Sequence, residues 1–370
     1  MRARPTVMMI PASPEAFTAD WLNEALASKL GAATVQSVAV KASDVPGQTA
    51  EIAFLDVTYS DPDCGLPTSI VAKYTSQNPQ VITDIIANYD QYRRESSFYK
   101  EFPDVGIATP ECIYVDYDQG KQEVVLLLAN LSPAESPSWA VSDAQVAMAV
   151  DALPGLHAKW WQDPILREKN WIVQFDNKDF FGAAMGAAHM VAPIIKELYG
   201  DVEVTQRAMT LMAEKLDAML AWTATRPFTF VHGDFHAKQM FFPTEAGGEF
   251  AVIDWQFPFV APGAWDVSRI IGLGLTDEQR RAQMEGLVAG YHAALIDRGV
   301  TGYSREELNV DISYGLAVSQ MIMVIASAQT DVTLIEKECS DLGVDWQDMM
   351  LYRTQNAMLE WNTLELLESI

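Results

Sequence analysis

Short stretches of alternating apolar and polar residues fill the N-terminal third of the chain, which is the pattern of half-buried strands. Clusters of proline, glycine and aspartate separate these stretches and indicate turns. A helix with Thr18 as its N-cap and Gly31 at its end precedes them. The pattern predicts an antiparallel meander with strands at 35–40, 51–59 and 69–74, and two further strands near 111–116 and 123–128.

A long amphipathic helix is predicted between the third and fourth strands. Asn78 is a suitable N-cap, Pro79 suits the first helical position, and large apolar residues recur at helical spacing to about Glu101. After the last strand, the segment 129–138 is polar and rich in proline, and we interpret it as a connection between two lobes. The expected organisation is an N-terminal lobe at 1–128, this connection, and a C-terminal lobe at 139–370.

Helical periodicity dominates the chain after the connection. The exception is Phe228–Asp254, where strand, loop, strand, turn and strand signals follow one another, with Glu245–Glu249 as the turn of a hairpin. These patterns predict an α+β fold with a small antiparallel β lobe and a larger, mainly helical lobe that carries a β-hairpin insert. The predicted helices are 142–161, 180–198, 204–225, 276–298, 304–330 and 346–368.

The composition narrows the classes of partner. Lys and Arg total 25 and Asp and Glu total 50 among 370 residues, so the net charge is 25 − 50 = −25. Such a charge repels nucleic acid and anionic membranes and is compatible with a neutral or cationic substrate. The cysteines show neither disulfide nor zinc spacing, the N-terminus lacks the apolar core of a signal peptide, and the apolar stretch Gly315–Ala328 is short for a bilayer span. We therefore expect a soluble, cytoplasmic protein of unknown oligomeric state.

Five polar residues together indicate phosphoryl transfer. Lys73 lies within a buried-strand pattern and needs a partner for its ammonium group, for which Glu95 in the following helix is a candidate. Asp234 and Gln239 lie on a loop and Asp254 ends the next strand, so a hairpin would bring these three side chains close together. Two carboxylates and an amide oxygen are suitable ligands for Mg²⁺. Phosphoryl transfer requires a lysine on the nucleotide phosphates, a metal between phosphates, and a carboxylate facing the acceptor hydroxyl.

The stretch HGDFHAKQ, from His232 to Gln239, followed by VIDW, which ends at Trp255, resembles the HGDxHxxN…DW signature of the aminoglycoside phosphotransferase and choline kinase-like superfamily. Members have a two-lobed protein-kinase-like fold, and the order of elements predicted above matches it. Leu156-His157-Ala158 is similar to the Leu-x-x-Leu-His-Ala helix of these families. The details most similar to the ecdysteroid-kinase-like branch are Arg94-Glu95, Phe98-Tyr99, Asp254-Trp255-Gln256 and Gly263-Ala-Trp-Asp266.

The resemblance implies a role for each residue that matches the motif. Lys73 would contact the phosphates of ATP, and Glu95 would pair with it. Asp234 would be the catalytic base or the carboxylate that orients the acceptor. Asp254 would chelate Mg²⁺ on the β- and γ-phosphates, and Gln239 would be the second metal ligand, where the family usually has asparagine.

Backbone and scaffold roles are implied at other positions. Ala129 and Leu131 would offer backbone groups to the adenine of ATP. Asp266 would brace the catalytic loop from behind, and the two loop histidines, His232 and His236, would be structural.

Three departures from the family pattern bear on activity. Gln239 is one methylene longer than asparagine, and Mg²⁺ demands near-ideal octahedral geometry, so a small displacement matters. The connection has Ala129-Asn130-Leu131 where the family often has Glu-Asp-Leu, which removes acidic side chains but keeps backbone donors. The turn expected to cover the phosphates, Ser43–Thr49, contains a single glycine.

These observations favour an ATP- and Mg²⁺-dependent kinase for a hydroxyl of a small molecule. The abundance of Trp, Met and Phe suits a lipophilic alcohol of steroid or hydroxyacyl type, whereas the acidity suits an amino sugar or a choline-like amine. Two alternatives stay open: a pseudokinase that binds nucleotide through a weakened metal site, and transfer of another group of ATP such as AMP. Lys73 at a strand edge and Glu95 on a charged helix face also have ordinary structural explanations.

Overall fold

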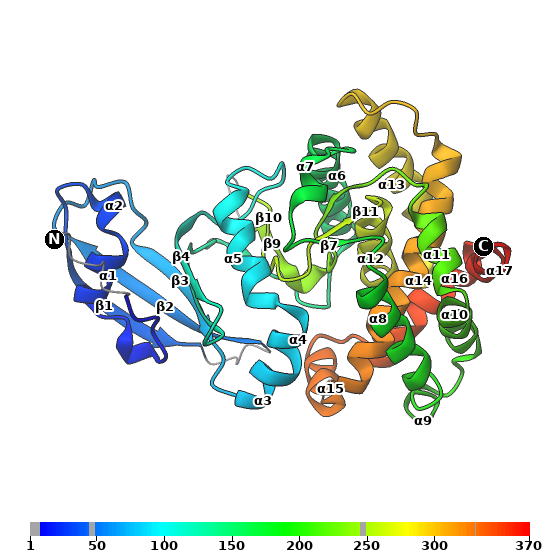
Figure 1. The fold of residues 1–370 in the computed structure, drawn as a ribbon, viewed down its shortest axis with the longest axis horizontal. Coiled ribbons are helices and arrows are strands. Elements are labelled where there is room, and N and C mark those ends of the chain that lie inside the picture. The colour runs from blue at the N-terminus through cyan, green and yellow to red at the C-terminus, as the bar shows by residue number, and fades with distance from the viewer. Residues whose placement is uncertain (1–7, 44–48, 245–248, 330) are drawn as a thin grey trace. The chain divides into compact units, whose positions relative to one another are not determined.

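The computed structural model of the chain describes residues 8–43, 49–244, 249–329 and 331–370. Contacts within the chain divide it into two compact units. Unit 1 contains Met1–Asp104, Thr109–Ser132 and Asp254–Gln256, and unit 2 contains Val105–Ala108, Pro133–Ile253 and Phe257–Ile370. The α+β class predicted from the sequence is confirmed, with a β-rich unit 1 and a mainly helical unit 2 (Figure 1).

Unit 1 is built on an antiparallel sheet of the predicted strands in the order β1-β2-β3-β5-β4, so β5 lies between β3 and β4. Apolar side chains at alternate strand positions pack against helices α1 (Ala19–Ala25) and α2 (Ala27–Leu30) on one face. Thr18 caps α1 as predicted, since its hydroxyl accepts from Trp21 N at 3.1 Å. The 3₁₀ turn η1 is Pro14–Ala16, and the strands are β1 (Val35–Ala42), β2 (Ala50–Tyr59), β3 (Ser69–Thr75), β4 (Cys112–Asp118) and β5 (Glu123–Ala129).

The other face of the sheet packs against the helical segment between β3 and β4. The prediction of one long helix there is wrong, because a π-helical turn and a left-handed residue interrupt it. The stretch from Val81 to Ile86 is rich in β-branched residues, which have a lower helix propensity. Asp90 then adopts φ +54°, a conformation that aspartate tolerates better than most residues. The segment comprises α3 (Pro79–Val81), η2 (Ile82–Ile86), α4 (Ala87–Tyr89) and α5 (Gln91–Glu101).

Within its described residues, unit 2 contains the predicted helices, three of which are divided, and three that periodicity did not reveal, α7, α12 and α15. Ser142 and Thr276 begin α6 and α13 with capping boxes. Every residue of α12 is buried, so it shows no amphipathic pattern. The helices are α6 (Asp143–Lys159), α7 (Ile165–Glu168), α8 (Lys178–Val191), α9 (Lys196–Tyr199), α10 (Glu203–Glu214), α11 (Leu216–Thr223), α12 (Ala264–Gly274), α13 (Asp277–Asp297), α14 (Arg305–Gln329), α15 (Val332–Asp341), η4 (Asp348–Tyr352), α16 (Arg353–Glu360) and α17 (Thr363–Ser369).

Two small sheets in unit 2 hold the ends of the loop that carries Asp234. β8 (Thr229–Val231) precedes the loop and pairs antiparallel with β11 (Phe259–Ala261), which pairs parallel with β7 (Val173–Gln174). After the loop, the predicted hairpin is present: its strands β9 and β10 pair antiparallel, and its turn residues 245–248 lie outside the described part of the chain. The strands of this second sheet are β6 (Ala134–Glu135), β9 (Met240–Pro243) and β10 (Ala251–Val252).

Helix α14 forms part of the core of unit 2 and packs against α8, α12 and α17 (Figure 1). Among the described residues, Arg305–Ala328 is the one helical stretch long and apolar enough to cross a membrane, but 78% of its most apolar window is buried within the protein. A Cβ on Gly315 would lie 2.5 Å from the Ser268 hydroxyl of α12, so glycine allows the close approach of these helices. Such burial is typical of a core helix.

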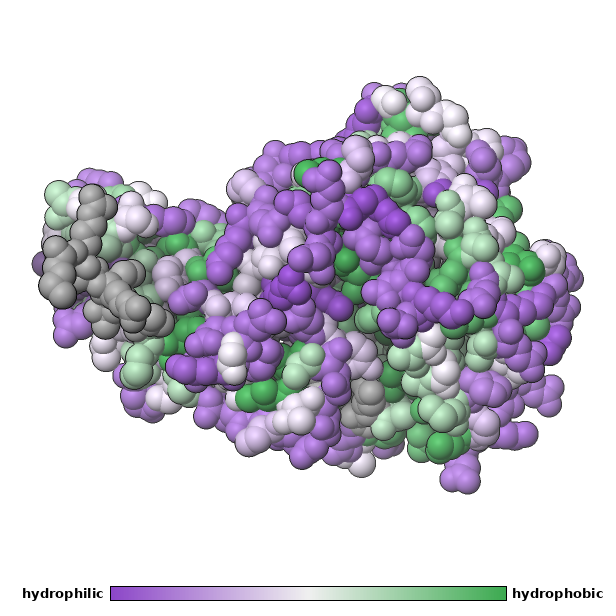
Figure 2. Space-filling model, viewed as in Figure 1, coloured by the Kyte–Doolittle hydropathy of each residue, from purple (hydrophilic) through white to green (hydrophobic). Residues whose placement is uncertain are grey.

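The face of the molecule seen in Figure 2 is largely hydrophilic, in accord with the acidic composition. Hydrophobic residues gather in a patch at the lower right, over the region of α9. Met190, near the end of α8, and Ile194, just before α9, are strongly exposed. Elsewhere on this face, smaller groups of hydrophobic residues lie among hydrophilic ones.

Candidate active site

Lys73 in unit 1 is held between two carboxylates. Ala72 and Tyr74 point into the apolar core shared with α1 and α2, so the alternation of β3 directs Lys73 to the opposite face, where α5 lies. Its Nζ lies 2.9 Å from Glu95 Oε1, 2.8 Å from Glu95 Oε2 and 2.9 Å from Asp254 Oδ1. The side chains of Lys73 and Glu95 are 13% and 1% exposed, so this ion pair is shielded from water.

These carboxylates set the protonation state of Lys73. Burial alone would lower the pKa of its ammonium group, but Asp254 and Glu95 outweigh burial and raise the pKa. Lys73 is therefore a fixed positive charge at neutral pH, which suits a residue that holds phosphate oxygens. Glu95 Oε2 also accepts from Gln256 Nε2 at 3.3 Å, a contact that sequence reasoning missed.

Trp255 anchors the segment that brings Asp254 to Lys73. Its fully buried ring stacks on Phe98 of α5, with ring centroids 4.1 Å apart and planes inclined by 6°. Asp254 itself has φ +65°, in the left-handed region that non-glycine residues seldom adopt. Backbone strain at a charged cluster is typical of functional sites.

Asp266 of α12 fixes the loop that carries Asp234. Its carboxylate accepts hydrogen bonds from the backbone N–H of His232 at 2.7 Å and of Gly233 at 2.9 Å. The buried His157 of α6 joins Asp266 to Tyr291, with Nε2–Oδ2 at 3.3 Å and Nδ1–Oη at 2.7 Å. Asp266 thus holds the backbone of the loop that carries Asp234, as the family resemblance implied.

Gly233 is required by the geometry of this loop. Its φ is +82°, and a Cβ there would lie 2.0 Å from Phe257 O and 2.4 Å from the ring of Phe259. Any side chain would meet both a disfavoured backbone conformation and a lack of space. The loop conformation that presents Asp234 therefore depends on glycine at this position.

Two basic groups contact the carboxylate of Asp234. Arg269 Nη2 and Nε lie 2.8 Å and 3.2 Å from Oδ1, and His236 Nε2 lies 3.3 Å from Oδ2. Burial alone would raise the pKa of Asp234, but the charges and hydrogen bonds of His236 and Arg269 hold it well below its usual value. Asp234 is therefore ionised at neutral pH.

Sequence reasoning missed Arg269 and assigned His236 a structural role alone. The available signal for Arg269 was an arginine in an otherwise apolar stretch, three residues after Asp266 and thus on the same helical face. Its partner in the loop is 35 residues away, a pairing that no local pattern records. The contact of His236 with Asp234 adds an electrostatic role to its structural one.

Gln239 ends the loop in the 3₁₀ turn η3 (Ala237–Gln239). Its N–H donates to His236 O at 2.9 Å, and its carbonyl accepts from Ile253 N at 2.9 Å. Ile253 directly precedes Asp254, so the backbone of Gln239 is tied to the strand end that leads to Asp254. Within the described ranges, no group of three or more His, Cys, Asp and Glu side chains forms a metal site by itself. The roles of Gln239 and Asp254 as metal ligands stay predictions.

The residues predicted to contact adenine lie at the end of β5. Ala129 N donates to the carbonyl of the residue before β4 at 2.9 Å, so an adenine contact there would use the Ala129 carbonyl. Asn130 donates to Ser69 through its backbone N–H at 3.2 Å and its side-chain amide at 3.0 Å, which fixes the chain just before Leu131. Most of the phosphate-covering turn, Ser43–Thr49, lies outside the described residues, and all these nucleotide roles stay predictions.

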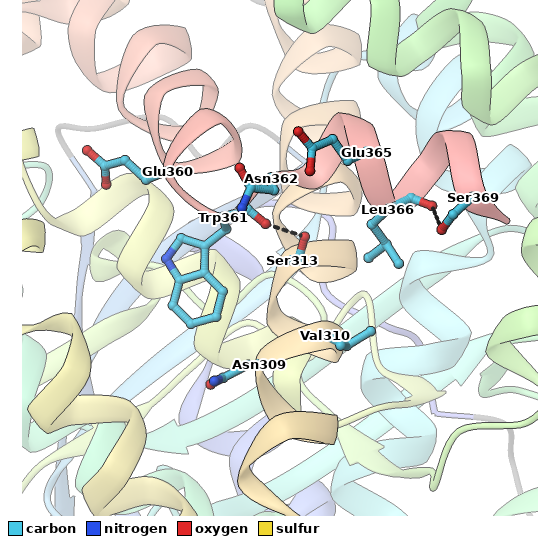
Figure 3. Close-up of a pocket in the computed structure, with 9 residues that line it drawn as sticks. All are labelled: Asn309, Val310, Ser313, Glu360, Trp361, Asn362, Glu365, Leu366 and Ser369. Carbon is cyan, nitrogen blue, oxygen red and sulfur yellow. Dashed lines mark hydrogen bonds between the residues drawn. The ribbon is translucent and has the colours of Figure 1, made fainter.

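A surface depression of about 530 Å³ lies near the C-terminus (Figure 3). Ser313 Oγ donates to Trp361 O at 3.1 Å on its wall. None of the predicted site residues lines it, so it gives no support for an acceptor site. Its lining residues are Asn309, Val310, Ser313, Glu360, Trp361, Asn362, Glu365, Leu366 and Ser369.

Comparisons with known proteins agree with this architecture. The model of a family described as "Phosphotransferase enzyme family" matches residues 84–305. The fold is similar to that of a candidate aminoglycoside phosphotransferase from Ralstonia eutropha, with 14% identity and a TM-score of 0.50 over 95% of this chain and 97% of that one. It is also similar to choline kinase from Cryptosporidium parvum, with 11% identity and a TM-score of 0.51 over 90% of each chain. A search of curated proteins found no match. The protein-kinase-like fold is thereby confirmed, while the ecdysteroid-kinase-like branch stays a prediction.

Proposed function

This chain belongs to the phosphotransferase enzyme family, and we propose that it is an ATP- and Mg²⁺-dependent kinase for a hydroxyl group of a small molecule. The observation that carries the proposal is the buried cluster in which Lys73 lies between Glu95 and Asp254. Phosphoryl transfer depends mainly on positioning and on neutralising charge. A cation held in a fixed place by two carboxylates supplies both.

The nucleotide end of the reaction is assigned to unit 1. Lys73 contacts the phosphates, and Glu95 and Gln256 keep Lys73 in place. The backbone at Ala129 and Leu131 meets the adenine. Burial alone would lower the pKa of Lys73, but the two carboxylates raise it. The raised pKa supports a role for Lys73 as a permanently charged ligand of the phosphates.

The donor set fits Mg²⁺ in its chemistry. This ion takes oxygen ligands, commonly one or two carboxylates together with phosphates and waters. Asp254 offers a carboxylate that is 26% exposed, and Gln239 offers an amide oxygen. We assign these two residues to hold the ion, which would neutralise charge on the phosphates when bound.

Asp234 is proposed to orient the acceptor hydroxyl. An efficient general base has a pKa near the operating pH. Burial alone would raise the pKa of Asp234, but His236 and Arg269 lower it well below its usual value. So acidic a carboxylate accepts a hydrogen bond from the hydroxyl and takes its proton late, which suits the loose transition state of phosphoryl transfer.

The charge balance at Asp234 favours a neutral alcohol over a polycation. The whole chain carries −25, yet the carboxylate of Asp234 already contacts Arg269 and His236. Because Arg269 neutralises the charge of Asp234, this carboxylate offers a cationic acceptor little net attraction. A neutral alcohol needs no such attraction, and we place a lipophilic alcohol of steroid or hydroxyacyl type ahead of amino sugars and choline-like amines.

An ADP-release screen tests the proposal. The protein is assayed with ATP and Mg²⁺ against sterols, hydroxyacyl thioesters, aliphatic alcohols, choline and aminoglycosides, with Asp234→Asn as the control. Acceptor-dependent release that Asp234→Asn abolishes, with a product heavier by one phosphate in mass spectrometry, supports the kinase. A product carrying an adenylate shows AMP transfer instead. Nucleotide binding without acceptor-dependent release across the panel favours the pseudokinase.

A further inference from the structure

A chain of side-chain contacts in unit 2 leads from Asp234 to Trp139. His236 Nε2 lies 3.3 Å from Asp234 Oδ2, and the His236 ring stacks on the Trp139 ring with centroids 5.1 Å apart and planes inclined by 28°. Lys238 Nζ lies 5.2 Å from the centroid of the Trp139 ring, within the range of a cation–π contact. The orientation of His236 against Asp234 therefore depends on how Trp139 is held.

Glu338 of α15 contacts both Lys238 and Ser138, the residue that precedes Trp139. Its Oε2 lies 3.0 Å from Lys238 Nζ, and its Oε1 accepts a hydrogen bond from the hydroxyl of Ser138, next to Trp139 in the chain. Ser138 has φ +53°, which a serine keeps only where other contacts compensate. Burial alone would raise the pKa of Glu338, but the hydrogen bonds from Ser138 and Lys238 lower it. Glu338 is thus ionised at neutral pH, and both contacts are charge-assisted.

We propose that Glu338 is a positioning residue for phosphoryl transfer, which acts through Lys238 and Trp139 to fix His236 against Asp234. The inference rests on the proposed function, because the orientation of Asp234 matters only if Asp234 receives an acceptor. Arg269 contacts Oδ1 of this carboxylate, so the His236 contact at Oδ2 fixes its rotation. A positioning effect of this kind changes turnover more than nucleotide affinity.

An ordinary surface ion pair is the competing interpretation. Glu338 and Lys238 are each 35% exposed, and pairs of such exposure contribute little to folding. Removal of a merely structural pair would change neither turnover nor the environment of the His236 ring. Because folding is little affected in either case, the two interpretations are separable by experiment.

The test compares Glu338→Gln with Glu336→Gln, a matched control at an exposed position of the same helix. The full-length protein is labelled with ¹⁵N-histidine, and the ring signals of His236 are assigned by their loss in His236→Gln. We expect Glu338→Gln to shift these signals and to lower kcat about tenfold, with KM for ATP changed by less than about twofold. The acceptor is the one that the ADP-release screen identifies. Glu336→Gln should match the wild type in both measurements.

The conservative variant Glu338→Asp gives a rescue experiment. It keeps a carboxylate at position 338 and leaves the contact of Lys238 with Trp139 in place, so its kcat should lie within about threefold of wild type and its His236 signals should lie nearer to those of wild type than the signals of Glu338→Gln do. The proposal is overturned if kcat of Glu338→Gln stays within about twofold of the control, if the His236 signals do not move, or if Glu338→Asp recovers neither measurement. If the wild type shows no acceptor-dependent turnover, the proposed function fails, and the histidine signals still report whether Glu338 controls His236.

Discussion

Replacement of Asp234 by asparagine should cost folding stability as well as transfer. Asparagine keeps the size of the side chain and an acceptor oxygen for Arg269, but it removes the negative charge. Arg269 is 5% exposed, and its Nη1 donates to Ser319 O of α14 at 3.3 Å. The variant therefore leaves a buried guanidinium group without its counter-ion, which is a destabilising arrangement.

The size of this effect follows from the geometry. At the Nη2–Oδ1 distance of 2.8 Å, an effective dielectric constant of about 20 gives a gross attraction of about 6 kcal/mol. Desolvation of both groups offsets much of this, and breaking a buried pair commonly costs about 3–5 kcal/mol. Asp234 is 23% exposed and asparagine retains a hydrogen bond, so we expect the free energy of unfolding to fall by about 2 kcal/mol at pH 7.

The loss of stability should depend on pH in a defined direction. Burial alone would raise the pKa of Asp234, but His236 and Arg269 lower it well below its usual value. A depressed pKa contributes stability that is fully present above the pKa of the unfolded chain, about 3.9, and is lost as the pH falls through the folded value. The difference between wild type and variant should therefore be full at pH 7 and smaller at pH 3.

Urea unfolding followed by tryptophan fluorescence at these two pH values measures the effect. Asp63→Asn, at an exposed position between β2 and β3, is the control for loss of a carboxylate. ADP release should be abolished in Asp234→Asn and unchanged in Asp63→Asn. The reasoning would be refuted if Asp234→Asn lowered the free energy of unfolding by less than about 0.5 kcal/mol, and by the same amount at both pH values. Substitution of an unpaired surface residue causes a change of that size.

Three further substitutions test other parts of the site. Asp254→Ala should remove the extra thermal stabilisation that Mg²⁺ adds in the presence of ATP, about 2.7 kcal/mol at about 100 times Kd; an unchanged magnesium dependence would contradict its role as a ligand. Gln239→Asn should preserve or raise the rate of ADP release, whereas full activity of Gln239→Ala would remove this residue from the metal shell. Gly233→Ala should destabilise the protein by more than about 3 kcal/mol in urea unfolding, because its Cβ would lie 2.0 Å from Phe257 O. Gly200→Ala has the same φ of +82° but its nearest neighbour at 3.9 Å, so it should cost about 1 kcal/mol; equal losses would show that the clash at Gly233 relaxes.

The fold was predictable where a local pattern determines structure. Alternation and turn residues located the strands of unit 1. The helices predicted to begin near positions 142 and 276 do so, with Ser142 and Thr276 as their caps, and capping is a local interaction. The single helix from Asn78 to Glu101 was wrong because periodicity alone does not register a π-helical turn or the left-handed Asp90. Helix α12 was missed because a helix buried on all sides has no polar face to reveal its period.

The candidate site was predictable only where residues share a motif or carry an obvious cost. The pairing of Lys73 with Glu95 followed from the cost of a lysine in a buried strand. Arg269 and Glu338 lie 35 and 100 residues from their partners in the loop. Tertiary packing creates such pairings. Charged residues are common on helices, and most of them make no contact with a distant loop of this kind. Structure was needed to show which of them reach the loop.

The segment Asp254–Gln256 has a consequence for protein engineering. By its contacts it belongs to unit 1, although the residues on both sides of it in the chain belong to unit 2. A fragment that ended at Ser132 would lack one carboxylate partner of Lys73 and the ring of Trp255 that covers Phe98. Chimeras that exchange N-terminal units between family members must therefore carry this segment with the donor unit. A crossover at the connection alone would leave Lys73 with a carboxylate partner that comes from the other protein.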